Sequence, residues 1–295
     1  MNKTYLKAKD NIKSINLNIF IALLPLLFTG FYKNGLKLYM NNLVSVYGLF
    51  KPLLFDIIGL LCGIIVNIIY NRIKKSNNKI FNDFYPLYGL LIASVISINT
   101  NIVLFTTSTF VLLLISKLLN NNKINIIAFT SLIIIFISNL LGQFTYLNLY
   151  EQKNTLTLNS LDYLIGRGSG GINTTYILVL IISLIVLSVN RYYKKEIPLY
   201  SSITFISCLT FYLIFTNKIG TILDNIFTNG ILFSYIFIAP EFLTSSYTKK
   251  GKIIYSIIIG VVTFILYLFY PPLSALGGII IASLCHRIID KLCQR

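Results

Sequence analysis

The sequence predicts an all-α polytopic membrane protein with about ten transmembrane helices. Of the 295 residues, 56% are hydrophobic and only 12% are charged, whereas soluble domains are about one quarter charged. The mean hydropathy is +0.77. The apolar residues form runs, and a transmembrane helix needs roughly 20 of them. Lysine and arginine give a net charge of +16, and they lie in short clusters between these runs. We therefore expect a single membrane domain and no large soluble module.

Ten apolar runs define the expected helices, and several are shorter than a full crossing. The last two runs are separated only by Tyr270, Pro271 and Pro272. Proline ends a preceding helix and is tolerated where a new helix begins. Such tight turns suit helix pairs or half-length helices packed inside a bundle. The runs fall near residues 15–33, 52–71, 85–98, 101–119, 124–146, 174–190, 198–216, 227–243, 251–270 and 271–289.

The distribution of basic residues predicts the orientation. Ten crossings leave only six of the 25 lysines and arginines on the side opposite the N-terminus. Because cytoplasmic loops carry the excess of positive charge, both termini are expected in the cytoplasm. A basic chain can also bind nucleic acid, but scattered clusters argue against that partner. The six residues on the outer side are Lys33, Lys37, Lys51, Lys153, Arg167 and Lys218.

The two halves of the chain share one pattern. Residues 84–119 place a short apolar segment, a polar turn and a longer apolar segment in series, and residues 231–270 repeat this order. Five crossings in each half would give the halves opposite orientations. Inverted repeats are common in transport folds, where the functional site lies near the interface between them. The single domain, 1–295, is thus predicted to comprise a first repeat over 1–146, an outer loop over 147–173 and a second repeat over 174–295.

Two acidic residues lie within or at the end of apolar runs. An acid at membrane depth is costly, so it usually faces a cavity or a partner and becomes a functional candidate. Asp56 is one, although it also lies five residues after Lys51, close to an interface. Glu241 ends the eighth run. Both interpretations of Asp56 remain open.

Two further stretches carry candidate binding residues. Hydroxyls and cations close together can hold a phosphate or a flavin headgroup, and an ordinary basic cytoplasmic loop is the simpler alternative. Glycines before a helix let the backbone approach a ligand and expose N–H groups, and a flexible loop is the alternative there. The first stretch contains Thr244, Ser245 and Thr248 before three lysines, and the second contains Gly168, Ser169, Gly170 and Gly171.

No motif of a soluble catalytic site occurs. The four cysteines form no CxxC pair, so they are expected as small hydrophobic residues. Cys62 or Cys208 could bind an iron–sulfur centre together with another subunit. His286 lies beside Arg287 near the end of the last run and is expected at the interface.

Residues 239–252, APEFLTSSYTKKGK, resemble a motif of the NqrB/RnfD family. These proteins are membrane subunits of sodium-pumping NADH:quinone reductase and of the Rnf electron transport complex, and their pattern is close to ATDPVTSPxTxxGR. Glu241 replaces the aspartate of the pattern and Lys252 its arginine. Residues 83–94 and 168–175 resemble two further family segments in the same order. The matching residues of the first motif are Ala239, Thr244, Ser245, Thr248 and Gly251.

The resemblance implies an RnfD-like electron-carrying subunit of an ion-translocating complex in the bacterial cell membrane. It implies other membrane subunits as partners and an FMN esterified to an outer-face threonine. Thr157 takes the position of that threonine, and Thr155 is the second choice. A second flavin is left open. The expected flavin-lining residues are Gly168, Ser169, Gly170, Gly171, Glu241, Thr244, Ser245 and Thr248.

Two other functions remain. The Ser, Ala and Pro of the family's S-x-A-T-P-L flavin motif are missing around Thr157, which favours a small-solute transporter or channel on a related inverted-repeat scaffold. A divergent subunit that has lost its covalent flavin and acts only as an anchor is the third possibility.

Overall fold

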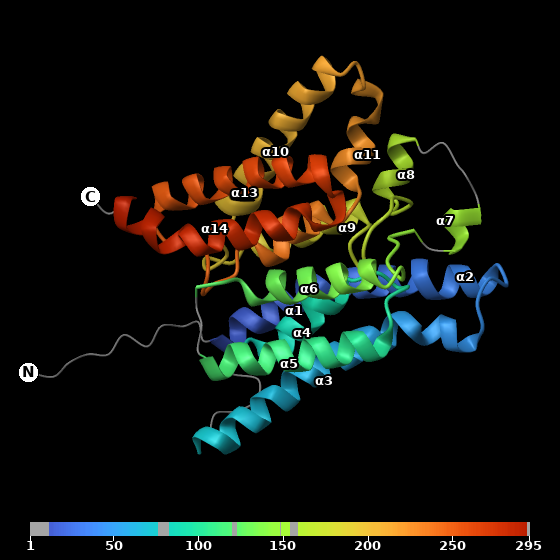
Figure 1. The fold of residues 1–295 in the computed structure, drawn as a ribbon, viewed down its shortest axis with the longest axis horizontal. Coiled ribbons are helices and arrows are strands. Elements are labelled where there is room, and N and C mark those ends of the chain that lie inside the picture. The colour runs from blue at the N-terminus through green and yellow to red at the C-terminus, as the bar shows by residue number, and fades with distance from the viewer. Residues whose placement is uncertain (1–11, 76–82, 120–122, 148, 154–158, 294–295) are drawn as a thin grey trace, which may run out of the picture.

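A computed structural model describes residues 12–75, 83–119, 123–147, 149–153 and 159–293 (Figure 1). The chain is 77% helical, and the described residues contain no strand, so the all-α prediction is confirmed. Within these described ranges, six helical stretches are long and apolar enough to cross a membrane. By length and composition, the chain is a multi-pass membrane protein.

Each of the ten predicted apolar runs overlaps a helical element, but among the described residues only six helical stretches reach spanning length. The six are Ile12–Met40, α3 (Val46–Lys74), α5 (Ile102–Leu119), α10 (Glu196–Phe215), α13 (Lys249–Phe269) and α14 (Pro271–Cys293). Three shorter helices are α4 (Tyr85–Val95), α6 (Ile126–Leu140) and α9 (Ile177–Ser188). The eighth run is broken into α11 (Ile222–Phe227), α12 (Ile231–Phe233) and the π-helix η4 (Ser234–Ile238).

The first helical stretch is longer than the sequence predicts. It comprises α1 (Ile12–Phe31), the π-helix η1 (Tyr32–Leu36) and α2 (Lys37–Met40). The polar residues of η1 do not end the helix, because Lys33, Asn34 and Gly35 are buried against the rest of the protein. Short π-helices are frequent at functional sites, since the extra residue in the turn re-aims the side chains around it.

The short helix α4 lies in the centre of the bundle, and ten of its 11 residues, Pro86 to Val95, are buried. It crosses α3 where two glycines face each other. A Cβ atom on Gly89 would lie 1.9 Å from the carbonyl oxygen of Gly59, and one on Gly59 would lie 2.4 Å from that of Gly89. Small residues let helix backbones approach closely in membranes, where packing replaces the hydrophobic driving force.

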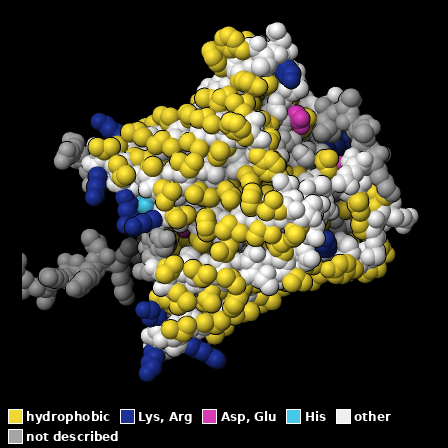
Figure 2. Space-filling view, viewed as in Figure 1, with side chains coloured by type: hydrophobic (Ala, Val, Ile, Leu, Met, Phe, Trp, Pro, Cys, Tyr) yellow, Lys and Arg dark blue, Asp and Glu magenta, His cyan; other side chains and the backbone are white. Residues whose placement is uncertain are grey.

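The molecule has two distinct ends. The first described residue and the end of α14 lie at the same end (Figure 1), which we call the basic end because Lys and Arg side chains gather there (Figure 2). The short helices α7 (Leu149–Lys153) and α8 (Ser160–Leu164) lie at the opposite end, which we call the loop end. The short element α4 precedes α5 and α6, and η4 precedes α13 and α14.

Candidate functional sites

The predicted site residues fall into two groups at opposite ends of the molecule. Residues 168–171 precede α9 at the loop end, whereas residues 241–248 precede α13 at the basic end (Figure 1). The two groups therefore cannot line one flavin site. Thr155 and Thr157 lie outside the described residues, in the interval between α7 and α8.

At the basic end, the Glu241 carboxylate is buried and both of its oxygens are hydrogen-bonded. The Tyr88 hydroxyl, from α4, donates to Oε1 over 2.5 Å. The Thr244 hydroxyl donates to Oε2. Burial raises the pKa of Glu241, and these two hydrogen bonds oppose that effect. Glu241 thus joins the start of α4 to the turn after η4, a contact between residues 153 positions apart.

A buried lysine that sequence reasoning missed lies beside this turn. The Lys194 ammonium donates to Ser245 twice, over 2.9 Å to the carbonyl and 2.6 Å to the hydroxyl oxygen. It also lies 4.0 Å from the centre of the Tyr247 ring, a cation–π contact. Burial, followed by the charge of Lys252, lowers the pKa of Lys194 to about 7. In the sequence Lys194 is one of two adjacent loop lysines, so no local signal marks it as buried.

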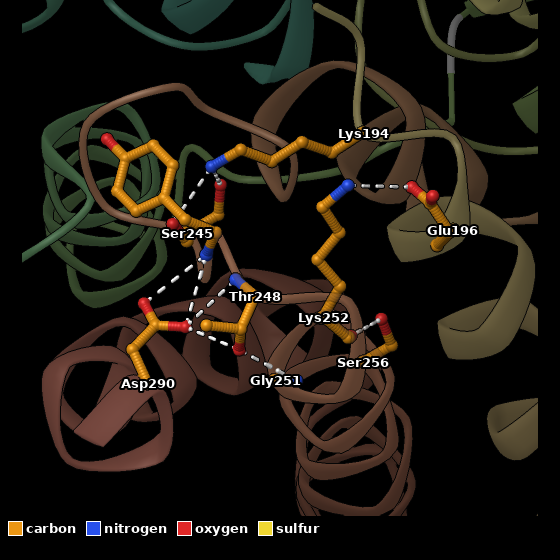
Figure 3. Close-up of polar contacts among 9 residues, drawn as sticks. Lys194, Glu196, Ser245, Thr248, Gly251, Lys252, Ser256 and Asp290 are labelled. Carbon is orange, nitrogen blue, oxygen red and sulfur yellow. Dashed lines mark hydrogen bonds and ion pairs between the residues drawn. The ribbon is translucent and has the colours of Figure 1, made fainter. Parts of the chain in front are cut away.

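The start of α13 already holds a carboxylate of the chain itself (Figure 3). Asp290, on α14, accepts hydrogen bonds from the Thr248 N–H over 3.2 Å and the Thr248 hydroxyl over 3.0 Å. It also accepts from the Tyr247 N–H over 3.2 Å and from the Ser246 hydroxyl. Thr248 in turn caps the helix by accepting from Gly251 N–H over 3.1 Å. A helix start favours an anion, and here Asp290 supplies it.

The basic-end residues therefore do not fit a flavin phosphate. The hydroxyls of Thr244, Ser245 and Thr248 all hydrogen-bond within the protein. The cavity next to Glu241 measures about 50 Å³, which is room for a water molecule, whereas ligand pockets usually measure about 300–1,000 Å³. The matched motif acts in this structure as a capping turn between α13 and α14.

At the loop end, the π-helix η1 fixes the glycine segment, residues 166–171. The buried Lys33 ammonium donates to the Gly168 carbonyl over 2.6 Å. Asn34 donates to the Ile172 carbonyl over 2.9 Å. Lys33 also forms a 2.8 Å ion pair with Glu151 of α7. Two consecutive polar residues of the first span thus anchor both the glycine segment and the helix that precedes the interval containing the two threonines.

The glycine segment packs closely on the end of α4. A Cβ atom on Gly171 would lie 2.3 Å from the Val95 carbonyl oxygen, so no larger residue fits there. The Ile172 N–H donates to the Ile96 carbonyl over 2.9 Å. The Asn173 N–H donates to the Ser94 carbonyl over 3.1 Å. These bonds satisfy carbonyls that the end of a helix leaves without partners, so this segment is a packed cap.

Part of the glycine segment still offers polar groups to a ligand. Ser169 and Gly170 are only half-buried. Beside them, the buried Thr175 hydroxyl has no hydrogen-bond partner, and its side chain lies against Gly170. A buried polar group without a partner calls for an explanation such as an absent water or ligand. These residues fit a polar group bound at the loop end.

A comparison with protein families decides the class of the chain. The model of the NQR2, RnfD, RnfE family matches residues 1–295. The chain belongs to this family. Membership makes it a membrane subunit of the Rnf/Nqr type, as the resemblance of residues 239–252 implies. No curated protein matches the chain.

Within this NQR2, RnfD, RnfE family member, the described residues show no group of His, Cys, Asp or Glu arranged to hold a metal ion. All four cysteines are free. Nothing in the described residues tests the alternative of an iron–sulfur centre shared with another subunit through Cys62 or Cys208.

The lowered pKa of Lys194 predicts a specific pH dependence of stability. Between pH 7 and about 10.4 the unfolded chain keeps a proton on this residue that the folded protein has lost. The folded state therefore gains stability as the pH rises through this window. Relative to Lys194→Met, wild-type protein should gain on the order of a few kcal/mol of unfolding free energy between pH 7 and 10.

The measurement is thermal unfolding in detergent, followed by tyrosine fluorescence at several pH values. Lys195→Met is the matched control, because Lys195 is adjacent to Lys194 but its side chain is exposed. This variant should follow the wild-type curve. Parallel curves for wild type and Lys194→Met would show that Lys194 keeps its charge in the folded protein.

Proposed function

We propose that the chain is an RnfD-like electron-carrying subunit of an ion-translocating membrane complex, with one FMN attached covalently in the outer loop. Thr157 is the proposed attachment residue, and Thr155 is the second choice. We further propose that the basic end faces the cytoplasm and the loop end faces outward in the bacterial cell membrane. The excess of Lys and Arg at the basic end supports this orientation (Figure 2).

The observation that carries the proposal is the fixed frame around the threonines. Glu151 of α7, paired with Lys33, lies four residues before Thr155. After the interval, Asn159 and Asp162 form a capping box that starts α8. The described residues on both sides of the interval are thus held at the loop end, and this supports an attachment site in the interval.

The residues of the chain would bind and orient the flavin. The threonine hydroxyl would carry the phosphoester, which retains the cofactor on a face open to the medium. The half-buried Ser169 and Gly170 and the unpartnered Thr175 hydroxyl would supply polar contacts. When bound, FMN would supply one-electron and two-electron redox chemistry, tuned by nearby dipoles. The satisfied hydrogen bonds of residues 244–248 give no support to a second flavin at the basic end.

Co-expression with a flavin transferase tests the proposal. Wild-type protein should carry ultraviolet-excited fluorescence that survives denaturing electrophoresis. Thr157→Ala should abolish the label, at least tenfold below wild type. Thr155→Ala is the matched control, being two residues away in the same loop, and should keep it.

The outcomes separate the alternative functions. Label retained by Thr157→Ala but lost in Thr155→Ala would move the attachment site. A wild-type protein without label would contradict covalent flavin and favour the anchoring or transport alternatives. Solute flux in liposomes without any redox partner would then identify a transporter.

A further inference from the structure

A buried acid in α3 has an incomplete set of hydrogen-bond partners. Asp56 is 5% exposed. Its Oδ1 accepts a 2.9 Å hydrogen bond from the Asn173 side-chain amide, whereas its Oδ2 has no partner. The same amide nitrogen also donates to the Ser94 hydroxyl oxygen over 3.1 Å. Among the described residues, one shared amide is thus the only hydrogen-bond donor to this carboxyl group inside a membrane span.

In the part of the chain that the structure describes, no cation forms an ion pair with this acid. On its own helix, Lys51 lies five residues away and its ammonium lies 6.0 Å from the centre of the Phe55 ring. The titratable residues of α4 are tyrosines near its start, at the end away from Ser94. Three described cations of other elements pair with other acids: Lys33 with Glu151, Lys117 with Asp83 and Arg167 with Asp162.

The cost of burying a charge decides which form the site holds. An isolated ionised carboxylate in a medium of low dielectric constant is strongly unfavourable, and a group in that position neutralises instead. A single amide donor, shared with Ser94, does not replace the hydration of a carboxylate. A neutral carboxylic acid removes the penalty while keeping the contact with Asn173.

We propose that Asp56 is a proton-binding residue of the membrane interior. Asn173 is the side chain that hydrogen-bonds to Asp56 in both its ionised and its protonated state. Binding converts the carboxylate and one proton into a carboxylic acid, and nothing is oxidised or reduced. An amide suits both states because it offers a donor and an acceptor. Its N–H₂ group serves the carboxylate, and its Oδ1, which has no partner, can accept from the acid after the amide turns.

The residues packed around Asn173 restrict the rotation of its amide and connect that rotation to neighbouring elements. Asn173 Oδ1 lies tightly against Gly30 of α1, where a Cβ atom would come within 1.9 Å of it. The backbone of Asn173 is bonded to Ser94 at the end of α4. The glycine segment ends at Gly171, and only Ile172 separates it from Asn173. A change in the Asn173 side chain is therefore transmitted to the close packing of α1, α4 and the glycine segment.

A route for protons begins at the loop end. An open hollow of about 500 Å³ there is lined by Lys51 and by Thr100, whose buried hydroxyl has no partner. Lys51 precedes Asp56 by five residues, which is about 8 Å along a helix. Polar, roomy hollows hold water, so water reaches to within about one and a half turns of the acid.

Infrared spectroscopy tests the proposal on purified, flavin-free protein in nanodiscs. Wild type should show the carbonyl-stretch band of a protonated, buried carboxylic acid at neutral pH, shifted in heavy water. Asp56→Asn, which has nearly the shape of the neutral acid, should lose that band and keep the wild-type melting temperature. Asn173→Leu should keep the band at a shifted frequency, because the hydrogen bond to the acid is gone.

Glu241→Gln is the matched control, because it removes the other buried acid and should leave the Asp56 band intact. A wild-type spectrum with no band that depends on Asp56 would overturn the proposal. A band that disappears when sodium chloride is added at constant pH would also overturn it, by making Asp56 a cation ligand. If Asp56→Asn does not fold, the frequency of the carbonyl-stretch band in Asn173→Leu tests the proposal instead. An unchanged frequency in that variant counts against the proposal.

Discussion

Gly89→Ala is expected to leave little folded protein, with a loss of about 3 kcal/mol or more in the free energy of unfolding. The added Cβ atom would lie 1.9 Å from the Gly59 carbonyl oxygen. That neighbour is backbone, so no side-chain rotation relieves the clash, and α3 and α4 must move apart. Because all residues of α4 after Tyr85 are buried, the displacement spreads to the helices around it. Yield of monodisperse protein and the melting temperature in detergent measure the effect.

Gly220→Ala is the control for this change. A Cβ atom at Gly220 meets no atom within 4 Å, so the same methyl group should change the melting temperature by less than about 2 °C. Gly59→Ala should resemble Gly89→Ala, since its Cβ atom would lie 2.4 Å from the Gly89 carbonyl oxygen. Wild-type stability in Gly89→Ala would mean that the two helices cross further apart than the structure shows.

The sequence located the apolar segments because charged clusters or short polar and proline-containing turns separate them, although only six described helical stretches reach spanning length. The first span was predicted to end too early because Lys33 and Asn34 resemble loop residues in the sequence. In the structure both are buried by hydrogen bonds to residues more than 130 positions away. Hydropathy detects the transfer of a side chain into lipid. It does not detect a lysine that is buried against a carbonyl group and a carboxylate of the same protein.

The candidate sites were predictable in composition but not in arrangement. Residues 244–248 carry the right hydroxyls, but their partner Asp290 lies on the next helix and takes the position of an external anion. The glycine segment was recognisable as special, whereas its packing against the end of α4 depends on long-range contacts. The pairing of Asp56 with Asn173 joins residues 117 positions apart, and no local pattern in a single sequence indicates it.

Lys33→Met should cost about 3 kcal/mol of unfolding free energy, because it breaks a buried ion pair from one side. The substitution leaves the Glu151 carboxylate without its 2.8 Å cation and the Gly168 carbonyl without its 2.6 Å donor. Local opening should follow in α7 and the glycine segment, the two elements that Lys33 holds together. The melting temperature measures the first effect, and limited proteolysis within residues 147–173 measures the second.

A double-mutant cycle distinguishes loss of the pair from loss of packing. Lys33→Met combined with Glu151→Gln should recover part of the stability, because no buried charge is then left without its partner. Lys218→Met, which changes an exposed lysine at the same end, should behave as wild type in both assays. If the two single changes simply add, Lys33 and Glu151 act independently, and the frame proposed for the two threonines loses its anchor. If they couple and Lys33→Met also lowers the covalent flavin label, the same ion pair supports both folding and cofactor attachment.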